Sequence, residues 1–234
     1  MVAGHMILVP GHAVWTGQGD PYDSSTWFLK PFQMHEPVFL IEHLQAGIEL
    51  AAADRNSLLV ISGAPTELRA GPRSEARSYL DLAASAEFWG HSALKDRCVV
   101  EEYALDSFLN LMFGLCRFKE VSGSWPTRIT VAGWGFKSKR FADLHRKALR
   151  WELPFDALAV NDPIEIEIAA TREASTRLQW AADPYGCNAP LSAKRSQRDH
   201  FHRLPPYAST CPELAALLLH QGPSLFAGPL PWDV

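Results

Sequence analysis

Three basic side chains follow two of the apolar runs in this sequence, each at a point where a helix is predicted to begin. Arg73 follows the run at residues 58–62, and Lys137 and Arg140 follow the run at residues 128–132. The free backbone amides of a helix N-terminus already attract an anion. An arginine adds a planar fork of donors that can grip a phosphate or a carboxylate. We therefore expect these three residues to hold a small anionic ligand.

Two further residues have side chains suited to proton transfer. Glu101 ends the predicted strand at residues 98–101, and His12 directly follows the predicted strand at residues 7–11. A carboxylate or an imidazole held beside a bound ligand can act as a general acid or base. Glu101 is equally suited to binding a ribose or an amine. We take Glu101 and His12 as the candidate catalytic residues.

A larger set of small or polar residues lies at the same strand ends and helix starts, where it would orient a ligand. Most of them have a structural alternative, because Ser-Gly makes a tight turn and Asp or Ser caps a helix. Asn110 is harder to explain in that way, since asparagine is unfavourable one turn inside a helix. Their joint occurrence at successive strand ends favours a site. Besides the three cations, the candidate ligand-binding residues are Gly11, Ser62, Gly63, Ser74, Glu75, Asp106, Ser107 and Asn110.

Several motifs with well-defined chemistry are absent from the sequence. It contains no Gly-x-Gly-x-x-Gly, no Gly-x-x-x-x-Gly-Lys-Ser/Thr and no Gly-x-Ser-x-Gly. It also contains neither Cys-x-x-Cys nor His-Glu-x-x-His, and His200 and His202 have no carboxylate or cysteine at a usable spacing. We therefore expect no metal site and assign no cofactor. Methyl transfer from an adenosyl donor is compatible with the fold but lacks the Gly-rich first loop.

The elements that must position these residues alternate between strand and helix along the chain. Strands are predicted at residues 7–11, 58–62, 98–101, 128–132 and 157–160, with helices at about 37–53, 72–85, 106–118, 136–149 and 163–181. This alternation predicts an α/β fold with right-handed crossovers. We expect a Rossmann-like three-layer sandwich with a mostly parallel sheet of five or slightly more strands.

The chain is expected to form one α/β domain over residues 1–182. Residues 15–33 make a long loop that is rich in aromatic side chains, which predicts a flap that packs down on the domain. Residues 183–234 are rich in proline and carry a basic run, with a short helix at about 212–220. We expect them to form an irregular C-terminal appendage on the same domain.

The composition of this chain of 234 residues limits the classes of partner that we expect for it. A formal net charge of −4 gives no indication of nucleic acid or of an anionic membrane surface. No apolar run approaches the roughly 18 residues of a membrane span, and no secretion signal is recognised at the N-terminus. The four cysteines form no closely spaced pair, which is typical of reduced thiols. We therefore expect a cytoplasmic protein, and the oligomeric state stays open.

An ordered set of these residues resembles a known family, the YdcF/SanA-type domain of unknown function. The set consists of Ser62-Gly63, Ser74-Glu75-Ala76, the stretch from Glu101 to Asn110, and the stretch from Lys137 to Arg140. The resemblance covers residues 7–163 and, more loosely, the tail, and other stretches are similar to the soluble fungal branch of the family. It implies a Rossmann-like domain with its site at the strand ends. The chain departs from the family at Lys137, where a histidine is usual.

These observations support two functional hypotheses. The first is an enzyme-like domain that binds a small phosphorylated or nucleotide-like metabolite and acts as a hydrolase or a group transferase. The second is a non-catalytic module that binds a nucleotide or S-adenosylmethionine. Both need the anion grip of Arg73, Lys137 and Arg140, whereas the enzyme also needs a general base such as Glu101 or His12.

Overall fold

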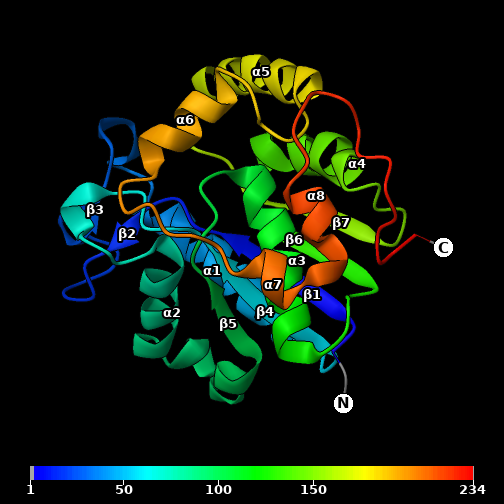
Figure 1. The fold of residues 1–234 in the computed structure, drawn as a ribbon. Coiled ribbons are helices and arrows are strands. Elements are labelled where there is room, and N and C mark those ends of the chain that lie inside the picture. Colours follow the sequence, from blue (N-terminus) through cyan, green and yellow to red (C-terminus); the bar gives the residue numbers. More distant parts are fainter. Residues whose placement is uncertain (1–2, 234) are drawn as a thin grey trace.

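The computed structural model describes residues 3–233 and has a five-stranded sheet at its centre (Figure 1). All neighbouring strands in this sheet are parallel, in the order β5-β4-β1-β6-β7. The predicted α/β class and parallel sheet are thus confirmed. The strands are β1 (His5–Pro10), β4 (Ser57–Ser62), β5 (Cys98–Glu101), β6 (Arg128–Trp134) and β7 (Phe155–Asn161).

The strands β1 and β4 are buried along their whole length because helices cover both faces of the sheet. In β1, Met6 and Leu8 enter the core on one face, and Ile7 and Val9 enter the core on the other. All four side chains are fully buried. Such continuous apolar runs are typical of strands in parallel sheets.

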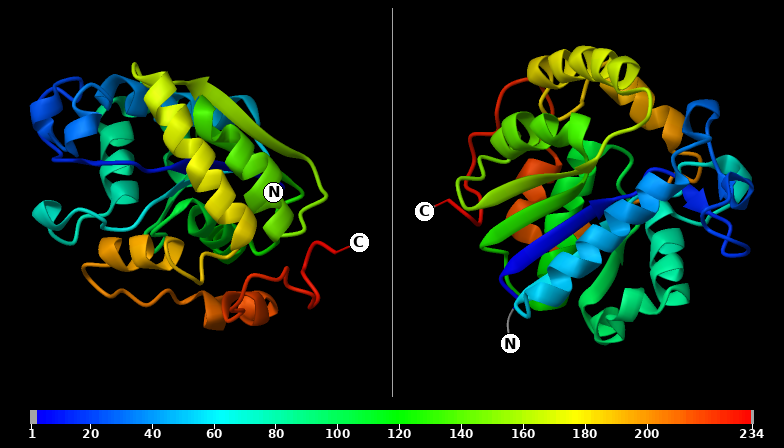
Figure 2. Two further views of the ribbon diagram at one scale, coloured as in Figure 1. Left: turned by 90° about the horizontal axis from the view of Figure 1, so that it is seen from above. Right: turned by 180° about the vertical axis from the view of Figure 1, so that it is seen from behind.

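Two helical layers sandwich the sheet (Figure 2). The helices α1 and α2 pack on one face, and α3 together with the segment at residues 140–148 packs on the other. A long helix, α5, lies outside this second layer and contacts residues 135–145. The helices are α1 (Pro37–Ala53), α2 (Glu75–Ser85), α3 (Ser107–Ser122), α4 (Arg146–Ala148), α5 (Ile166–Ala182), α6 (Leu191–Arg198), α7 (Tyr207–Thr210) and α8 (Ala215–Leu218).

The strand order determines where a ligand can reach the sheet. The chain runs from β1 outward to β4 and β5, and then returns across the sheet to place β6 on the other side of β1. The loops that leave β1 and β6 therefore part to opposite sides of the sheet. In open α/β sheets, such a switch point opens a crevice beyond the carboxyl ends of the strands.

The loop after β1 contains a small ribbon that the sequence reading missed. Its strands β2 (Val14–Trp15) and β3 (Trp27–Phe28) are antiparallel. Trp27 is buried and meets the ring of Tyr79 on α2 edge to face, with 6.0 Å between the ring centroids. Trp15 and Trp27 thus anchor this loop, residues 14–33, on the domain as a flap, whereas Tyr22 and Phe32 are exposed.

Two helices differ from their predicted form near the site. Helix α2 begins at Glu75 and Ser74 is its N-cap, so Pro72 precedes the helix instead of lying in its first turn. The helix predicted to run continuously to residue 149 is a 3₁₀ turn, a π-helical segment at Arg140–His145 and then the short α4. π-Helical turns are rare and are found frequently at functional sites.

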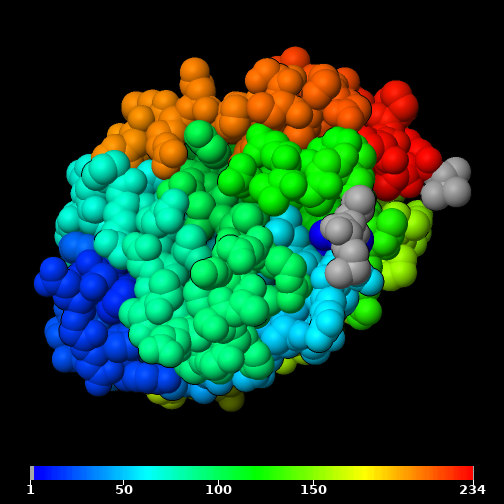
Figure 3. Space-filling view, turned by 90° about the horizontal axis from the view of Figure 1, so that it is seen from below, coloured from blue at the N-terminus to red at the C-terminus, as the bar shows by residue number. Residues whose placement is uncertain are grey.

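The C-terminal tail packs on the same body as the sheet. Tyr207, Leu214 and Leu217 are buried in one apolar cluster with Met6 and Leu8 of β1. Helix α7 contacts α3, and the orange tail lies directly against the green segment in Figure 3. Among the described residues, no helix combines the length and apolar character needed to cross a membrane.

Candidate functional site

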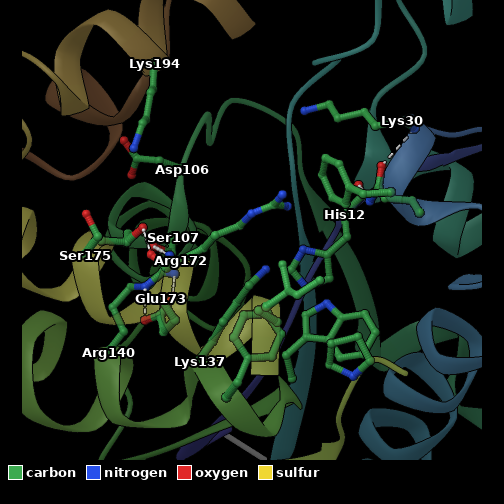
Figure 4. A pocket seen from close by; sticks show the side chains of 18 of the residues that line it. His12, Lys30, Asp106, Ser107, Lys137, Arg140, Arg172, Glu173, Ser175 and Lys194 are labelled. Atoms are coloured by element: carbon green, nitrogen blue, oxygen red, sulfur yellow. Dashed lines mark hydrogen bonds and ion pairs between the residues drawn. The ribbon is translucent and has the colours of Figure 1, made fainter. Parts of the chain in front are cut away.

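A cavity of about 650 Å³ opens at the carboxyl end of the sheet. Its wall is built from the loops after β1 and β6, the start of α3, the flap and one side of α5 and α6. Figure 4 shows Lys30 across the cavity from Ser107, Arg140 and Glu173. The volume lies within the usual range for small-molecule sites. Its charged lining residues are Lys30, Lys137, Arg140, Arg172, Lys194 and Arg198, with Glu36, Asp106, Glu165 and Glu173.

The cations of this cavity outnumber the acids available to neutralise them. Glu173 pairs with Arg140, and Asp106 pairs with Arg195 behind the wall. Within residues 3–233, no ion pair joins Lys30, Lys137 or Arg172 to an acid. The cavity therefore offers uncompensated positive charge.

Lys137 is the most perturbed cation of the cavity. It lies in the turn after β6, and its ammonium nitrogen is 5.3 Å from the ring centroid of Phe136. Burial and the neighbouring charge of Arg140 lower the pKa of Lys137 to about 7. No hydrogen bond to its ammonium group is found within residues 3–233. An anion beside it would restore the charged form of the amine.

Arg140 is held in place by Glu173 of α5. Its Nε donates to one carboxylate oxygen at 2.8 Å, and a terminal nitrogen donates to the other. The two side chains are only 12% and 5% exposed. Arg140 also donates to the hydroxyl of Ser107 at 3.1 Å. This fork-to-fork pair fixes a guanidinium group in the cavity wall.

Ser107 and His145 contact one another at the base of the same wall. Ser107 is the first residue of α3, after its N-cap Asp106, and its hydroxyl lies 2.8 Å from Nε2 of His145. His145 is fully buried. Burial and the charge of Arg140 hold the pKa of His145 well below its usual range. The imidazole is therefore neutral at physiological pH.

His12 lies at the switch point between β1 and β6. Its ring is 5.9 Å from that of His43 and 6.2 Å from that of Trp134, measured between centroids. Burial, then the charge of Lys137, lowers the pKa of His12 well below its usual range. His43 is oriented by Asn161, whose side-chain oxygen is 2.7 Å from its Nε2. His12 thus faces the cavity as a neutral ring.

Glu101 lies deeper than the cavity and is already fully engaged. Its carboxylate accepts from Ser62 at 2.5 Å, from Tyr207 at 3.1 Å, and from the amides of Tyr103 and Ala104. Burial raises its pKa to about 7 against the opposing effect of these bonds. Glu101 is 1% exposed and does not line the cavity. Its position links β4, β5 and the tail.

A smaller cavity of about 120 Å³ adjoins the first and contains more of the predicted residues. Gly11, Glu75 and Asn110 line it. A side chain at Gly11 would place its Cβ 2.6 Å from Cβ of Glu75, and one at Gly63 would place it 2.7 Å from the Glu75 carboxylate. Because neither position has a side chain, the buried Glu75 can approach the strand ends. Burial raises the pKa of the Glu75 carboxyl group.

Five of the predicted residues line neither cavity, and two of these are engaged elsewhere. Arg73 pairs with Asp81 at 2.7 Å, beneath the turn of the flap. Ser74 caps α2 by accepting from the Arg77 amide at 2.8 Å, and it donates to Glu102. The predicted residues that reach a cavity are Gly11, His12, Glu75, Asp106, Ser107, Asn110, Lys137 and Arg140, while Ser62, Gly63 and Glu101 lie behind them.

Several residues that line the larger cavity are not among the predicted site residues. Arg172 and Glu173 lie on α5, where no motif marks them. Lys194 and Arg198 lie in the tail, where the basic run is the only sequence signal for them. No cluster of His, Cys, Asp and Glu suited to a metal ion occurs among residues 3–233.

Comparison with known proteins gives one distant relative with no described activity. The chain is 27% identical to YOR238W, an uncharacterised protein of Saccharomyces cerevisiae, over 87% of this chain and 86% of the yeast protein. No family model matches the chain. No solved structure matches it either. The fold and site geometry therefore carry the functional argument, and the YdcF/SanA resemblance stays a prediction.

Proposed function

We propose that the cavity binds a small phosphorylated or nucleotide-like anion and that the protein acts on this ligand as a hydrolase or group transferase. The observation that carries the proposal is Lys137, a cation in the cavity wall with no acid paired to it in residues 3–233. Lys30 and Arg172 add positive charge from the opposite wall and from α5. A phosphoryl group that binds there loses its hydration shell, and the fixed positive charges of the cavity stabilise it in place of water.

The ligand class is tested by a thermal-shift screen of pyrophosphate, nucleoside phosphates, sugar phosphates and S-adenosylmethionine. A ligand at 100 times its Kd should add about 2.7 kcal/mol of stability. We expect a phosphate-bearing compound to raise the Tm of the parent protein and to lose this effect in Lys137→Met. The matched control is Lys147→Met, which removes the same charge from an exposed position on α4. A parent protein that no phosphate-bearing compound stabilises would contradict the proposal.

The second candidate function is a non-catalytic module that binds a nucleotide or S-adenosylmethionine. The engagement of Glu101 in four hydrogen bonds favours it, because a carboxylate so occupied is not free to serve as a general base. In the screen, this function would appear as stabilisation by an adenosyl compound with no turnover of any phosphate ester.

A further inference from the structure

The contact between Ser107 and His145 joins two residues that are 38 positions apart in sequence. Ser107 lines both cavities, so its hydroxyl lies at the boundary between the buried imidazole and the ligand space. The imidazole ring is held between Phe141 at 5.3 Å and Trp180 at 4.7 Å, measured between centroids. Nε2 of His145 is thereby fixed towards the serine.

The other nitrogen of this imidazole has no partner. Nδ1 of His145 is buried and makes no hydrogen bond within residues 3–233. A buried unpaired polar group costs about 1–3 kcal/mol, and such exceptions in folded proteins call for an explanation. A neutral ring that carries its proton on Nδ1 has an unprotonated Nε2, which can accept the proton of the Ser107 hydroxyl.

We propose that Ser107 is a nucleophile and His145 its general base, and that the pair takes a phosphoryl group from the anionic ligand. This inference rests on the proposed function and names its chemical step. A serine within hydrogen-bond reach of a neutral histidine is the usual arrangement of an activated hydroxyl. Arg140 donates to the same hydroxyl and is held in place by Glu173, so a fixed cation stands beside the reacting oxygen.

The step can be written with atoms and charges balanced. Oγ of Ser107 forms a bond to phosphorus while the bond from phosphorus to the leaving oxygen breaks. The hydroxyl proton moves to Nε2 of His145 and then to the leaving oxygen. Water next attacks the phosphoserine, giving its proton to His145, and the Ser107 oxygen leaves and recovers that proton.

The surrounding charge favours phosphoryl transfer over transfer of an uncharged acyl group. Lys137 and Arg140 line both cavities together with Ser107, and Arg172 lines the larger one. A phosphoryl group carries negative charge on its non-bridging oxygens, and fixed cations stabilise it as it transfers. An uncharged acyl group carries no negative charge for most of these cations to stabilise.

The proposal is tested by labelling the full chain with a fluorophosphonate probe and mapping the modified peptide by mass spectrometry. We expect the label on Ser107, no label at that position in Ser107→Ala, and labelling at least tenfold slower in His145→Gln. The matched control, Ser192→Ala on α6, removes a hydroxyl outside the cavity lining and should label like the parent.

Measurements on the parent protein alone can overturn the proposal. The test therefore does not depend on whether the variants fold. Folded parent protein that binds a phosphate-bearing compound but leaves Ser107 unlabelled would refute the nucleophile and leave the proposed function standing. Equal labelling rates in the parent and a folded His145→Gln would refute the base. Labelling of Ser107 without any binding of phosphate-bearing compounds would refute the proposed function and the phosphoryl assignment. A burst of product from p-nitrophenyl acetate but none from p-nitrophenyl phosphate would also overturn that assignment.

Discussion

Replacement of Glu173 by alanine is expected to lower the free energy of unfolding by about 3–5 kcal/mol. The substitution removes the partner of Arg140 and leaves a guanidinium group that is 12% exposed with no carboxylate beside it. Breaking one side of a buried ion pair costs this much because the remaining charge stays desolvated. Chemical denaturation at pH 7.5 measures the loss.

The control for this substitution lies on the same helix. Glu167→Ala removes a carboxylate from an exposed position of α5 and should change stability by less than about 0.5 kcal/mol. If Glu173→Ala and Glu167→Ala cost equally little, Arg140 is not held by Glu173 in solution. The cavity would then lack the fixed cation assigned to its wall.

Glu101→Gln is expected to remove a pH dependence of stability worth about 3 kcal/mol. The folded protein raises the pKa of Glu101 from 4.5 to about 7, and each unit corresponds to about 1.4 kcal/mol. Because the raised pKa means that the folded state binds the proton more tightly, its contribution is fully present below pH 4.5. It is lost as pH rises through 7. Glutamine carries no ionisable proton and lacks this loss.

The measurement compares the two proteins by denaturation at pH 4.5 and pH 8. The free energy of unfolding of the parent should fall relative to that of Glu101→Gln as pH rises, whatever their difference at pH 4.5. The comparison cancels other groups shared by both proteins, such as Glu75, whose pKa burial also raises. Parallel pH profiles would show that folding does not raise the pKa of Glu101 and that its hydrogen bonds offset its burial.

The fold was largely predictable because its signals are local. Apolar runs such as residues 58–62 can be buried on both faces only within a parallel sheet, and the helical stripe of residues 37–53 gives the same bounds in the structure. The ribbon of β2 and β3 escaped prediction because each of its strands has two residues. No periodicity is measurable over so short a run.

The site was predictable where strand ends supply it and not where distant segments fold over it. His12 and Lys137 follow β1 and β6, so strand position alone places them at one edge of the sheet. His145 has no such marker, because its contact with Ser107 depends on how a π-helical turn packs on α3. Arg73 has the expected position in sequence, but Asp81, two turns along the next helix, holds it away from the cavity.

The most direct test of the account is the affinity of the cavity for sulfate at pH 6 and pH 8. Sulfate keeps its two charges over this range, so changes in binding report on the protein. The other charged groups that act on Lys137 are Arg140, Glu173, Glu36 and Arg198. With the pKa of Lys137 at about 7, its charged fraction falls roughly tenfold between the two pH values.

Titration calorimetry on the parent and on Lys137→Met provides the measurement. The account predicts binding that weakens roughly tenfold from pH 6 to pH 8 in the parent, and weak, pH-independent binding in the variant. Equal affinities of the two proteins at both pH values would contradict the claim that Lys137 and its cavity hold the anion.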